Sequence, residues 1–155
     1  MLYLDASALI KCYLKEAGTG ALIARITEPN QRIFTSILSF AEVHAAMARK
    51  HRGKYLNSTE LAQLRDTFAR DWALILHTVE LNLQTASEIP SLAEKYPIKA
   101  GDAVHLSAAL WINRTIQTEA DSRERASLEF CVADRALAEI ANRCGLLVYN
   151  PEEER

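Results

Sequence analysis

The chain has 155 residues, 49% of them hydrophobic and 25% charged, and its 18 Lys and Arg against 20 Asp and Glu give a net charge of −2. This length fits one domain that buries a core without disulfide bonds, and the composition excludes disorder and fibrous repeats. No apolar run is long enough to cross a bilayer, and the first residues lack the pattern of a signal peptide, so we expect a soluble, cytoplasmic protein with no membrane partner. The slightly acidic charge argues against a protein that holds nucleic acid by charge alone.

Short apolar runs alternate with amphipathic segments in the first half of the chain. A helix after Asn57 is indicated by Leu61, Leu64, Phe68 and Trp72, which recur every three or four residues, and by Glu60, which forms a capping pair with Asn57. The other elements expected here are a strand at Leu2–Leu4, a helix from its cap Ser7 to Lys15, a helix over Ala21–Glu28, a strand at Ile33–Thr35 and a helix over Leu38–Arg52 that ends at Gly53.

The second half repeats this alternation. The elements expected are a strand at Leu74–Leu76, a helix over Leu83–Lys95 that Pro90 either kinks or divides, an apolar helix over Ala103–Asn113, a polar mobile loop over Thr115–Ser127, a strand at Phe130–Val132, a helix over Arg135–Arg143 and a strand at Leu146–Tyr149. Strands that alternate with helices predict an α/β sandwich whose parallel sheet is covered on both faces. We expect a single domain over residues 1–150, followed by a short acidic tail at 151–155.

Four acidic residues stand where such a fold concentrates its chemistry. Asp5 and Asp134 directly follow predicted strands, while Glu42 and Asp102 lie near helix starts within apolar stretches. Each has a structural explanation as a cap or as a charge favoured by the helix dipole. However, no Lys or Arg lies one helical turn from Glu42 or Asp102 toward its apolar neighbours, and an unpaired buried charge is costly. A hard divalent cation is the simplest compensation.

These acids also carry a family resemblance. The segments Asp5-Ala6-Ser7-Ala8-Leu9, Ser39-Phe40-Ala41-Glu42-Val43, Asp102-Ala103-Val104-His105-Leu106 and Ala133-Asp134-Arg135-Ala136-Leu137 resemble the four acidic motifs of the PIN-domain family. Their order and their separations of 37, 60 and 32 residues are similar to those of VapC-type toxin ribonucleases. Any one motif is weak, but four in order on an α/β pattern are specific, and the resemblance runs from residue 2 to about residue 149.

The resemblance implies a three-layer sandwich with a five-stranded parallel sheet and a metal-dependent endoribonuclease. Mg²⁺ or Mn²⁺ would be held by Asp5, Asp102 and Asp134, with Glu42 holding a second metal or a metal-bound water. The substrate implied is RNA, either tRNA or mRNA, cut by in-line attack of water. The resemblance also implies a cognate antitoxin protein that silences the enzyme, and self-association as a homodimer, for which we expect the helices between Leu38 and Trp72 to provide the surface.

Other side chains are expected to support this site. Ser7 is interpreted as a donor that orients Asp5 or as the cap of its helix, and His105 as a supporting or packing residue rather than the general base, since a metal already activates water. Basic residues are candidates for contact with RNA phosphates, with a helix C-terminus or a solvated loop as the structural explanation. These residues are Arg49, Lys50, Arg52, Lys54, Arg123, Arg125 and Arg135.

One departure from the family pattern keeps an alternative open. Val132 stands where the family usually has Thr or Ser, two residues before its last Asp, so a PIN-fold module that binds RNA or protein without catalysis is the first rival. A receiver-like phospho-acceptor would need paired acids near the N-terminus and a Lys after its last strand, and the chain has neither. A flap-type DNA nuclease would share the chemistry but needs extra helices to hold branched DNA.

Overall fold

The structure, a computed structural model, describes residues 1–119 and 127–153. In chain order these residues form β1 (Leu2–Leu4), α1 (Ala6–Ile10), α2 (Thr19–Ile26), β2 (Ile33–Ser36), α3 (Ile37–Arg52), α4 (Ser58–Leu74), β3 (Leu76–Val79), α5 (Ile89–Lys95), α6 (Ala100–Glu119), β4 (Glu129–Cys131), α7 (Arg135–Arg143) and β5 (Leu147–Tyr149). Within the described chain, no helix is both long and apolar enough to cross a membrane.

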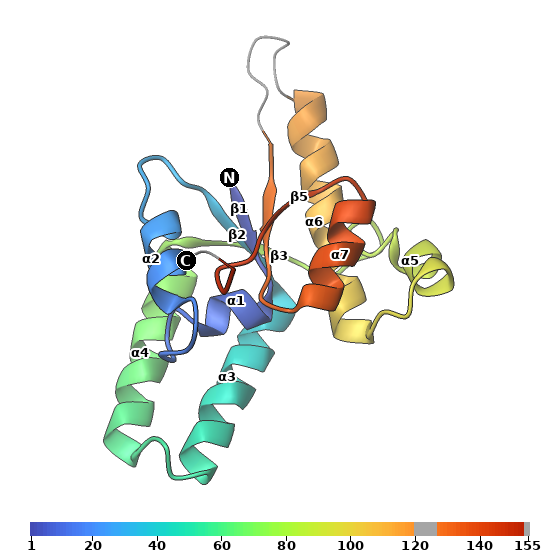
Figure 1. Cartoon of the computed structure of the whole chain (residues 1–155). Coiled ribbons are helices and arrows are strands. Elements are labelled where there is room, and N and C mark those ends of the chain that lie inside the picture. Colours follow the sequence, from blue (N-terminus) through green and yellow to red (C-terminus); the bar gives the residue numbers. More distant parts are fainter. Residues whose placement is uncertain (120–126, 154–155) are drawn as a thin grey trace.

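The strands form one five-stranded parallel sheet in the order β3-β2-β1-β4-β5. Strand β1 lies at its centre, where Leu2 is paired with Ile33 of β2 on one side and with Glu129 of β4 on the other. Helices α1 to α4 lie on one side of the sheet and α5 to α7 on the other, as Figure 1 shows. The predicted α/β sandwich with a parallel sheet covered on both faces is confirmed.

The two faces of the sheet bury two separate cores. Successive side chains of a strand point to opposite faces, so Leu2 and Leu4 pack with α1 to α4, whereas Tyr3 between them packs with α6 and α7. Neighbouring β4 divides in the same way, with Cys131 in the first core and Phe130 in the second. This alternation fixes which face each residue of the central strands can reach.

The long helices α3 and α4 form a hairpin that extends beyond the sheet (Figure 1). Asn57 begins α4 with the predicted capping box, because its side chain accepts from the Glu60 N–H while the Glu60 carboxylate accepts from the Asn57 N–H. Between the two helices, Phe40 stacks on Phe68 at 5.6 Å and meets Trp72 edge to face at 5.1 Å. The apolar stripe of this hairpin is therefore used largely to join its two helices.

Several predicted boundaries were wrong. Asp5, not Ser7, caps α1, and α1 ends at Ile10 rather than Lys15, because the chain turns directly after the strand. The apolar run Leu74–Leu76 belongs mostly to the end of α4, and the strand is Leu76–Val79, which pairs with β2.

The remaining boundaries concern α5 and α6. Pro90 divides the segment, since α5 begins only at Ile89, with Pro90 in its first turn where a missing N–H costs nothing. Helix α6 runs from Ala100 to Glu119, so residues 115–119 are helical rather than part of a loop. The rest of the predicted loop, residues 120–126, lies outside the described residues.

Candidate active site

The four predicted acids come from four different elements near the carboxyl ends of the central strands. Asp5 follows β1, and its backbone N–H donates to the Cys131 carbonyl at the end of β4 (3.1 Å), which brings the start of the β4–α7 connection alongside. Asp134 caps α7 at the end of that connection, while Glu42 lies on α3 and Asp102 in the first turn of α6. The acids thus lie along one edge of the sheet, where the carboxyl ends of its parallel strands meet.

Asp5 is almost completely buried, with 4% of its surface exposed. Its carboxylate accepts hydrogen bonds from the Ala8 N–H and from the Ser7 hydroxyl, each at 2.8 Å. Burial raises the pKa of Asp5 to about 6, and the charge of Asp102 adds to this, although His105 and the two donors act in the opposite direction. No ion pair reaches Asp5 within the described residues, so its negative charge is stabilised by the two hydrogen bonds and by the more distant His105.

Asp102 and Asp134 share the same electrostatic environment. Burial raises the pKa of Asp102, the charges of Asp134 and Glu42 raise it further, and the charge of Lys99 acts in the opposite direction. Lys99 lies one helical turn before Asp102, on the side away from the apolar stretch, and the sequence interpretation did not consider it. Asp134 is exposed and accepts from the Leu137 N–H at 3.1 Å as the cap of α7. The acids therefore repel one another across the edge of the sheet.

Glu42 approaches this edge from α3. Its Oε2 is hydrogen-bonded to His105 Nε2 at 2.9 Å, and its Oε1 lies beside Gly101, where an added Cβ would come within 3.4 Å of the oxygen. A larger side chain at position 101 would crowd this carboxylate against the start of α6. Contacts with two residues of α6 thus hold the Glu42 side chain near Asp102, which lies in the first turn of that helix.

The donor set fits a hard divalent cation by chemistry and charge. Carboxylate oxygens are the ligands that Mg²⁺ and Mn²⁺ prefer. Burial, and to a lesser extent the neighbouring carboxylates, raise the pKa values of Asp5 and Asp102, and a bound cation would oppose both effects. As they lie, however, no three His, Cys, Asp or Glu side chains in the described part of the chain are close enough to enclose an ion.

Ser7 joins Asp5 to the β4–α7 connection. Its hydroxyl donates to Asp5 and accepts from the Ala133 N–H at 3.0 Å, so one side chain ties two strand ends together. Of the two roles considered from the sequence, contact with Asp5 is observed and the helix cap is not. Val132 is fully buried in the core and does not contribute to this edge.

His105 is 2% exposed and forms hydrogen bonds through both ring nitrogens. Nε2 faces Glu42, and Nδ1 lies 3.2 Å from the hydroxyl of Tyr3, which is itself fully buried. Burial raises the pKa of Tyr3 well above its usual range, and the charge of Asp5 adds to this effect. The role of Tyr3 was not predicted from the sequence, because it belongs to a short apolar run on β1 and its partner His105 lies 102 positions away.

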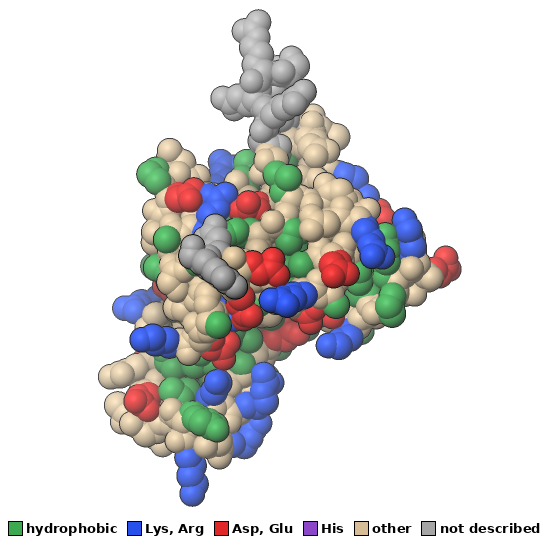
Figure 2. Space-filling model, viewed as in Figure 1, with side chains coloured by type: hydrophobic (Ala, Val, Ile, Leu, Met, Phe, Trp, Pro, Cys, Tyr) green, Lys and Arg blue, Asp and Glu red, His purple; other side chains and the backbone are tan. Residues whose placement is uncertain are grey.

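The basic candidates are dispersed. Figure 2 shows Lys and Arg side chains gathered on the lobe formed by α3 and α4, below a group of Asp and Glu side chains. Arg49 and Arg52 lie two to three turns beyond Glu42 on α3, about 10–15 Å along the helix axis. The others are Lys50, paired with Glu16 at 3.4 Å, exposed Lys54 in the turn after α3, Arg135, paired with Glu153 at 3.3 Å, and Arg123 and Arg125, which lie outside the described residues.

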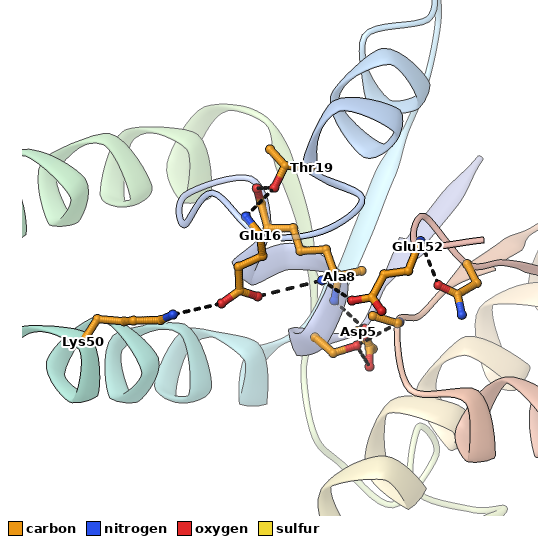
Figure 3. Close-up of polar contacts among 10 residues, drawn as sticks. Asp5, Ala8, Glu16, Thr19, Lys50 and Glu152 are labelled. Atoms are coloured by element: carbon orange, nitrogen blue, oxygen red, sulfur yellow. Dashed lines mark hydrogen bonds and ion pairs between the residues drawn. The ribbon is translucent and has the colours of Figure 1, made fainter. Parts of the chain in front are cut away.

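A pocket of about 660 Å³ reaches from Ser7 and Ala133 to Arg49, and none of the four acids lines it. One wall holds Lys11, which is 3% exposed and pairs with Glu152 at 2.6 Å and Glu16 at 3.8 Å. Figure 3 shows Glu152 approaching α1 from one side and Glu16, between α1 and Lys50, from the other. The sequence interpretation missed this network and took residues 151–155 for a plain acidic tail.

The fold and the arrangement of acids agree with what the sequence comparisons find. The PIN domain family model matches residues 2–123, which include Asp5, Glu42 and Asp102. This chain belongs to the PIN-domain family. Two curated proteins of Mycobacterium tuberculosis, ribonucleases VapC45 and VapC49, are each 32% identical to it over 110 residues, which cover 71% of this chain and 75% of the relative.

Solved structures share the fold of this PIN domain. FitAcB of Neisseria gonorrhoeae has a TM-score of 0.69 at 15% identity over 99% of this chain and 100% of that one. VapBC2 of Rickettsia felis, bound to a promoter DNA fragment, has a TM-score of 0.63 at 15% identity over 97% and 98% of the two chains. A toxin–antitoxin complex of Klebsiella pneumoniae has a TM-score of 0.61 at 17% identity over 99% and 100%. At these identities the likeness shows the fold alone.

Proposed function

We propose that this PIN domain is a VapC-like toxin, an endoribonuclease that needs Mg²⁺ or Mn²⁺ and is neutralised by a cognate antitoxin. The observation that carries the proposal is the set of mutually repelling carboxylates at the strand ends, of which Asp5 is buried without an ion pair in the described chain. The 32% identity to two curated ribonucleases supports the same activity.

The residues that would hold the cation are Asp5, Asp102 and Asp134, with Glu42 beside them. A bound divalent cation would lower the pKa of water for attack on phosphorus and offset the charge that builds on the phosphate oxygens. Ser7 keeps the Asp5 carboxylate in one orientation through its hydrogen bond, and His105 does the same for Glu42. No nucleophilic Ser or Cys is needed, because water is the attacking group.

A protein partner is the second part of the proposal. Two of the structural neighbours are described as a VapBC pair and as a toxin–antitoxin complex, which supports a cognate antitoxin for this chain. We infer that the antitoxin acts near the acidic edge, since a segment placed there would block access of RNA to all four carboxylates at once.

Self-association is the third part. Ile37 and Phe40 at the start of α3, and Leu74 and Ile75 at the end of α4, are exposed, with 82% of the Leu74 surface accessible. The Phe40–Trp72 contact brings these helix ends together, so the exposed apolar side chains support a homodimer surface. We expect size-exclusion chromatography with light scattering to give a dimer at micromolar concentration and a monomer for Leu74→Glu; a monomeric wild type would contradict this part.

The decisive experiment is cleavage of a mixed tRNA and mRNA pool by purified chain free of antitoxin, with Mn²⁺, Mg²⁺ or EDTA. We expect cleavage with metal, none with EDTA, and a loss of more than about 100-fold in Asp5→Asn, which exceeds the cost typical of losing an outer hydrogen-bond partner. Glu60→Gln is the control, because Glu60, like Asp5, accepts a hydrogen bond from a backbone N–H at the start of a helix, but it lies at the start of α4, away from the four acids.

Three other outcomes contradict the proposal, provided that both variants are folded by circular dichroism. Cleavage that persists in EDTA would contradict the metal dependence, and equal loss of activity in Asp5→Asn and Glu60→Gln would contradict a specific role of Asp5. Absence of cleavage with either metal, in protein that binds Mn²⁺ by calorimetry, would favour the catalytically inactive PIN-fold binding module.

A further inference from the structure

A chain of hydrogen bonds links the central strand to the acidic edge. The Tyr3 hydroxyl on β1 lies 3.2 Å from His105 Nδ1 on α6, and His105 Nε2 lies 2.9 Å from Glu42 Oε2 on α3. Tyr3 is 0% and His105 2% exposed, so the contact between them is shielded from water, whereas the Glu42 side chain is 39% exposed. Three elements that are distant in sequence thus meet through one imidazole ring.

The chemistry of Tyr3 and Glu42 determines where the hydrogens lie in this series of hydrogen bonds. A carboxylate offers only acceptor atoms, so the ring nitrogen that faces Glu42 must carry a hydrogen. In the neutral imidazole the other nitrogen, Nδ1, is then an acceptor, and its partner is the Tyr3 O–H. The hydroxyl of Tyr3 therefore favours the one neutral tautomer of His105 that can donate to Glu42.

Packing keeps the hydroxyl in place. The Tyr3 ring stacks on Phe130 of the adjacent strand at 5.6 Å and 25°, and meets the edge of His105 at 6.1 Å and 75°. Because β1 is paired on both sides, its backbone cannot shift without breaking the sheet. The imidazole consequently holds Oε2 of Glu42, and no hydrogen bond within the described residues occupies Oε1.

We propose that Tyr3 is a positioning residue for Glu42, acting through the tautomer of His105 so that one carboxylate oxygen is kept for a divalent cation. The part concerning the cation rests on the proposed function. The alternative is that the Tyr3 hydroxyl serves only the fold, through its interaction with Ser36. In that case the tautomer of His105 would not depend on the Tyr3 hydroxyl.

The test compares Tyr3→Phe with the wild type at about pH 8, where an ordinary histidine is neutral. Nitrogen-15 NMR of the metal-free protein is expected to show the Nε2–H tautomer of His105 in the wild type and a mixture with Nδ1–H in Tyr3→Phe. Titration calorimetry is expected to show Mn²⁺ binding weakened a few-fold, because the loss is set by the fraction of His105 that leaves the Nε2–H tautomer. Tyr13→Phe is the matched control, since it removes a Tyr hydroxyl that contacts Asp71 at 3.1 Å, away from this chain of contacts.

Two substitutions of His105 give a second readout. In His105→Gln the side-chain amide nitrogen can stand near the place of Nε2 and donate to Glu42, whereas the shorter side chain of His105→Asn cannot reach it. We expect His105→Gln to keep Mn²⁺ affinity within a few-fold and His105→Asn to lose at least about 10-fold.

The two readouts separate the inference from the proposed function. A Tyr3→Phe protein that is folded by circular dichroism and keeps the wild-type tautomer overturns the role of Tyr3, whether or not the chain cleaves RNA. A wild type that binds no Mn²⁺ overturns the proposed metal site, while the tautomer in the metal-free protein still decides how Glu42 is positioned.

Discussion

The two ends of α1 bury opposite charges in opposite ways. Asp5 before the helix is 4% exposed and Lys11 after it is 3% exposed. Lys11 lies against Glu152 and Glu16, whereas Asp5 has hydrogen bonds but no cation partner in the described chain, and Asp102 adds further negative charge. The fold itself compensates the charge at one end of the helix and leaves the other uncompensated.

This difference separates a structural charge from a functional one. Leaving a buried charge without a partner costs free energy, so a fold that retains one gains something else from it. At Lys11 the ion pairs anchor the chain after β5 to α1, which is a structural role. At Asp5 the missing charge is the one that a divalent cation supplies in the proposed function.

The largest expected effect on stability comes from Asp5→Asn. Asn keeps the capping hydrogen bond from Ala8 but removes the buried negative charge, so we expect the metal-free protein to gain about 3 kcal/mol in free energy of unfolding at pH 7. Thermal unfolding would show a melting temperature several degrees higher than that of the wild type, in a variant that we expect to be inactive. A lower melting temperature would mean that Asp5 serves the fold instead.

The gain should depend on pH in a defined window. The pKa of Asp5 rises from 3.8 to about 6 on folding, so between these values the folded state holds the proton that the unfolded state has lost. Asp5 therefore makes the wild type less stable as pH rises from about 4 to about 6, with no further change above. In urea titrations across this range, the difference between Asp5→Asn and wild type should grow from near zero to its full value; a constant difference would exclude titration of Asp5 as its cause.

At the other end of α1, removing one partner should have the opposite sign. Glu152→Gln leaves Lys11 charged and buried with only Glu16 at 3.8 Å, so we expect a loss of about 1–3 kcal/mol in free energy of unfolding. The neighbouring Glu153→Gln is the control, since its pair with Arg135 is largely exposed and should contribute less than about 0.5 kcal/mol. Equal effects of the two substitutions in urea unfolding would show that burial of Lys11 does not matter.

The smallest effect is expected at the solvent end of the same network. Lys50 is 42% exposed where it pairs with Glu16, so Lys50→Met should change the free energy of unfolding by less than about 1 kcal/mol. The change should shrink at high ionic strength, because salt screens exposed pairs. Urea unfolding at low and at high salt checks this prediction. A large loss in free energy of unfolding that does not depend on salt would show that Lys50 behaves like a buried charge.

Much of the fold followed from local pattern. Helix α7 was predicted with its observed bounds, because an Asp cap and an apolar face that recurs at helical spacing agree with each other. The strand at Leu74–Leu76 was misplaced because β3 is an edge strand with exposed His77 and Thr78, so it lacks the continuous apolar run of the buried strands. Ser7 and Asp5 are both good caps, and only the turn out of β1 decides between them.

Asp5 and Asp134 were predicted from the rule that the carboxyl ends of parallel strands meet at one edge, whereas Glu42 and Asp102 were predicted from their apolar surroundings and from the family resemblance. Their supporting contacts could not be predicted, because these depend on which residues the sheet register brings together. Tyr3 and His105 are 102 positions apart and Lys11 and Glu152 are 141 apart, and neither pair has any local signal. That the four acids bind a metal remains a prediction.

The central position of β1 has a consequence for when the acidic edge can form during synthesis. Leu2 leaves the ribosome 127 residues before its partner on one side, Glu129. Until β4 has been made, nothing fixes the β4–α7 connection and Asp134 beside Asp5, however well β1 and β2 have paired. A growing chain therefore cannot assemble all four acids before translation has passed Asp134, and until then this protein lacks its complete candidate site.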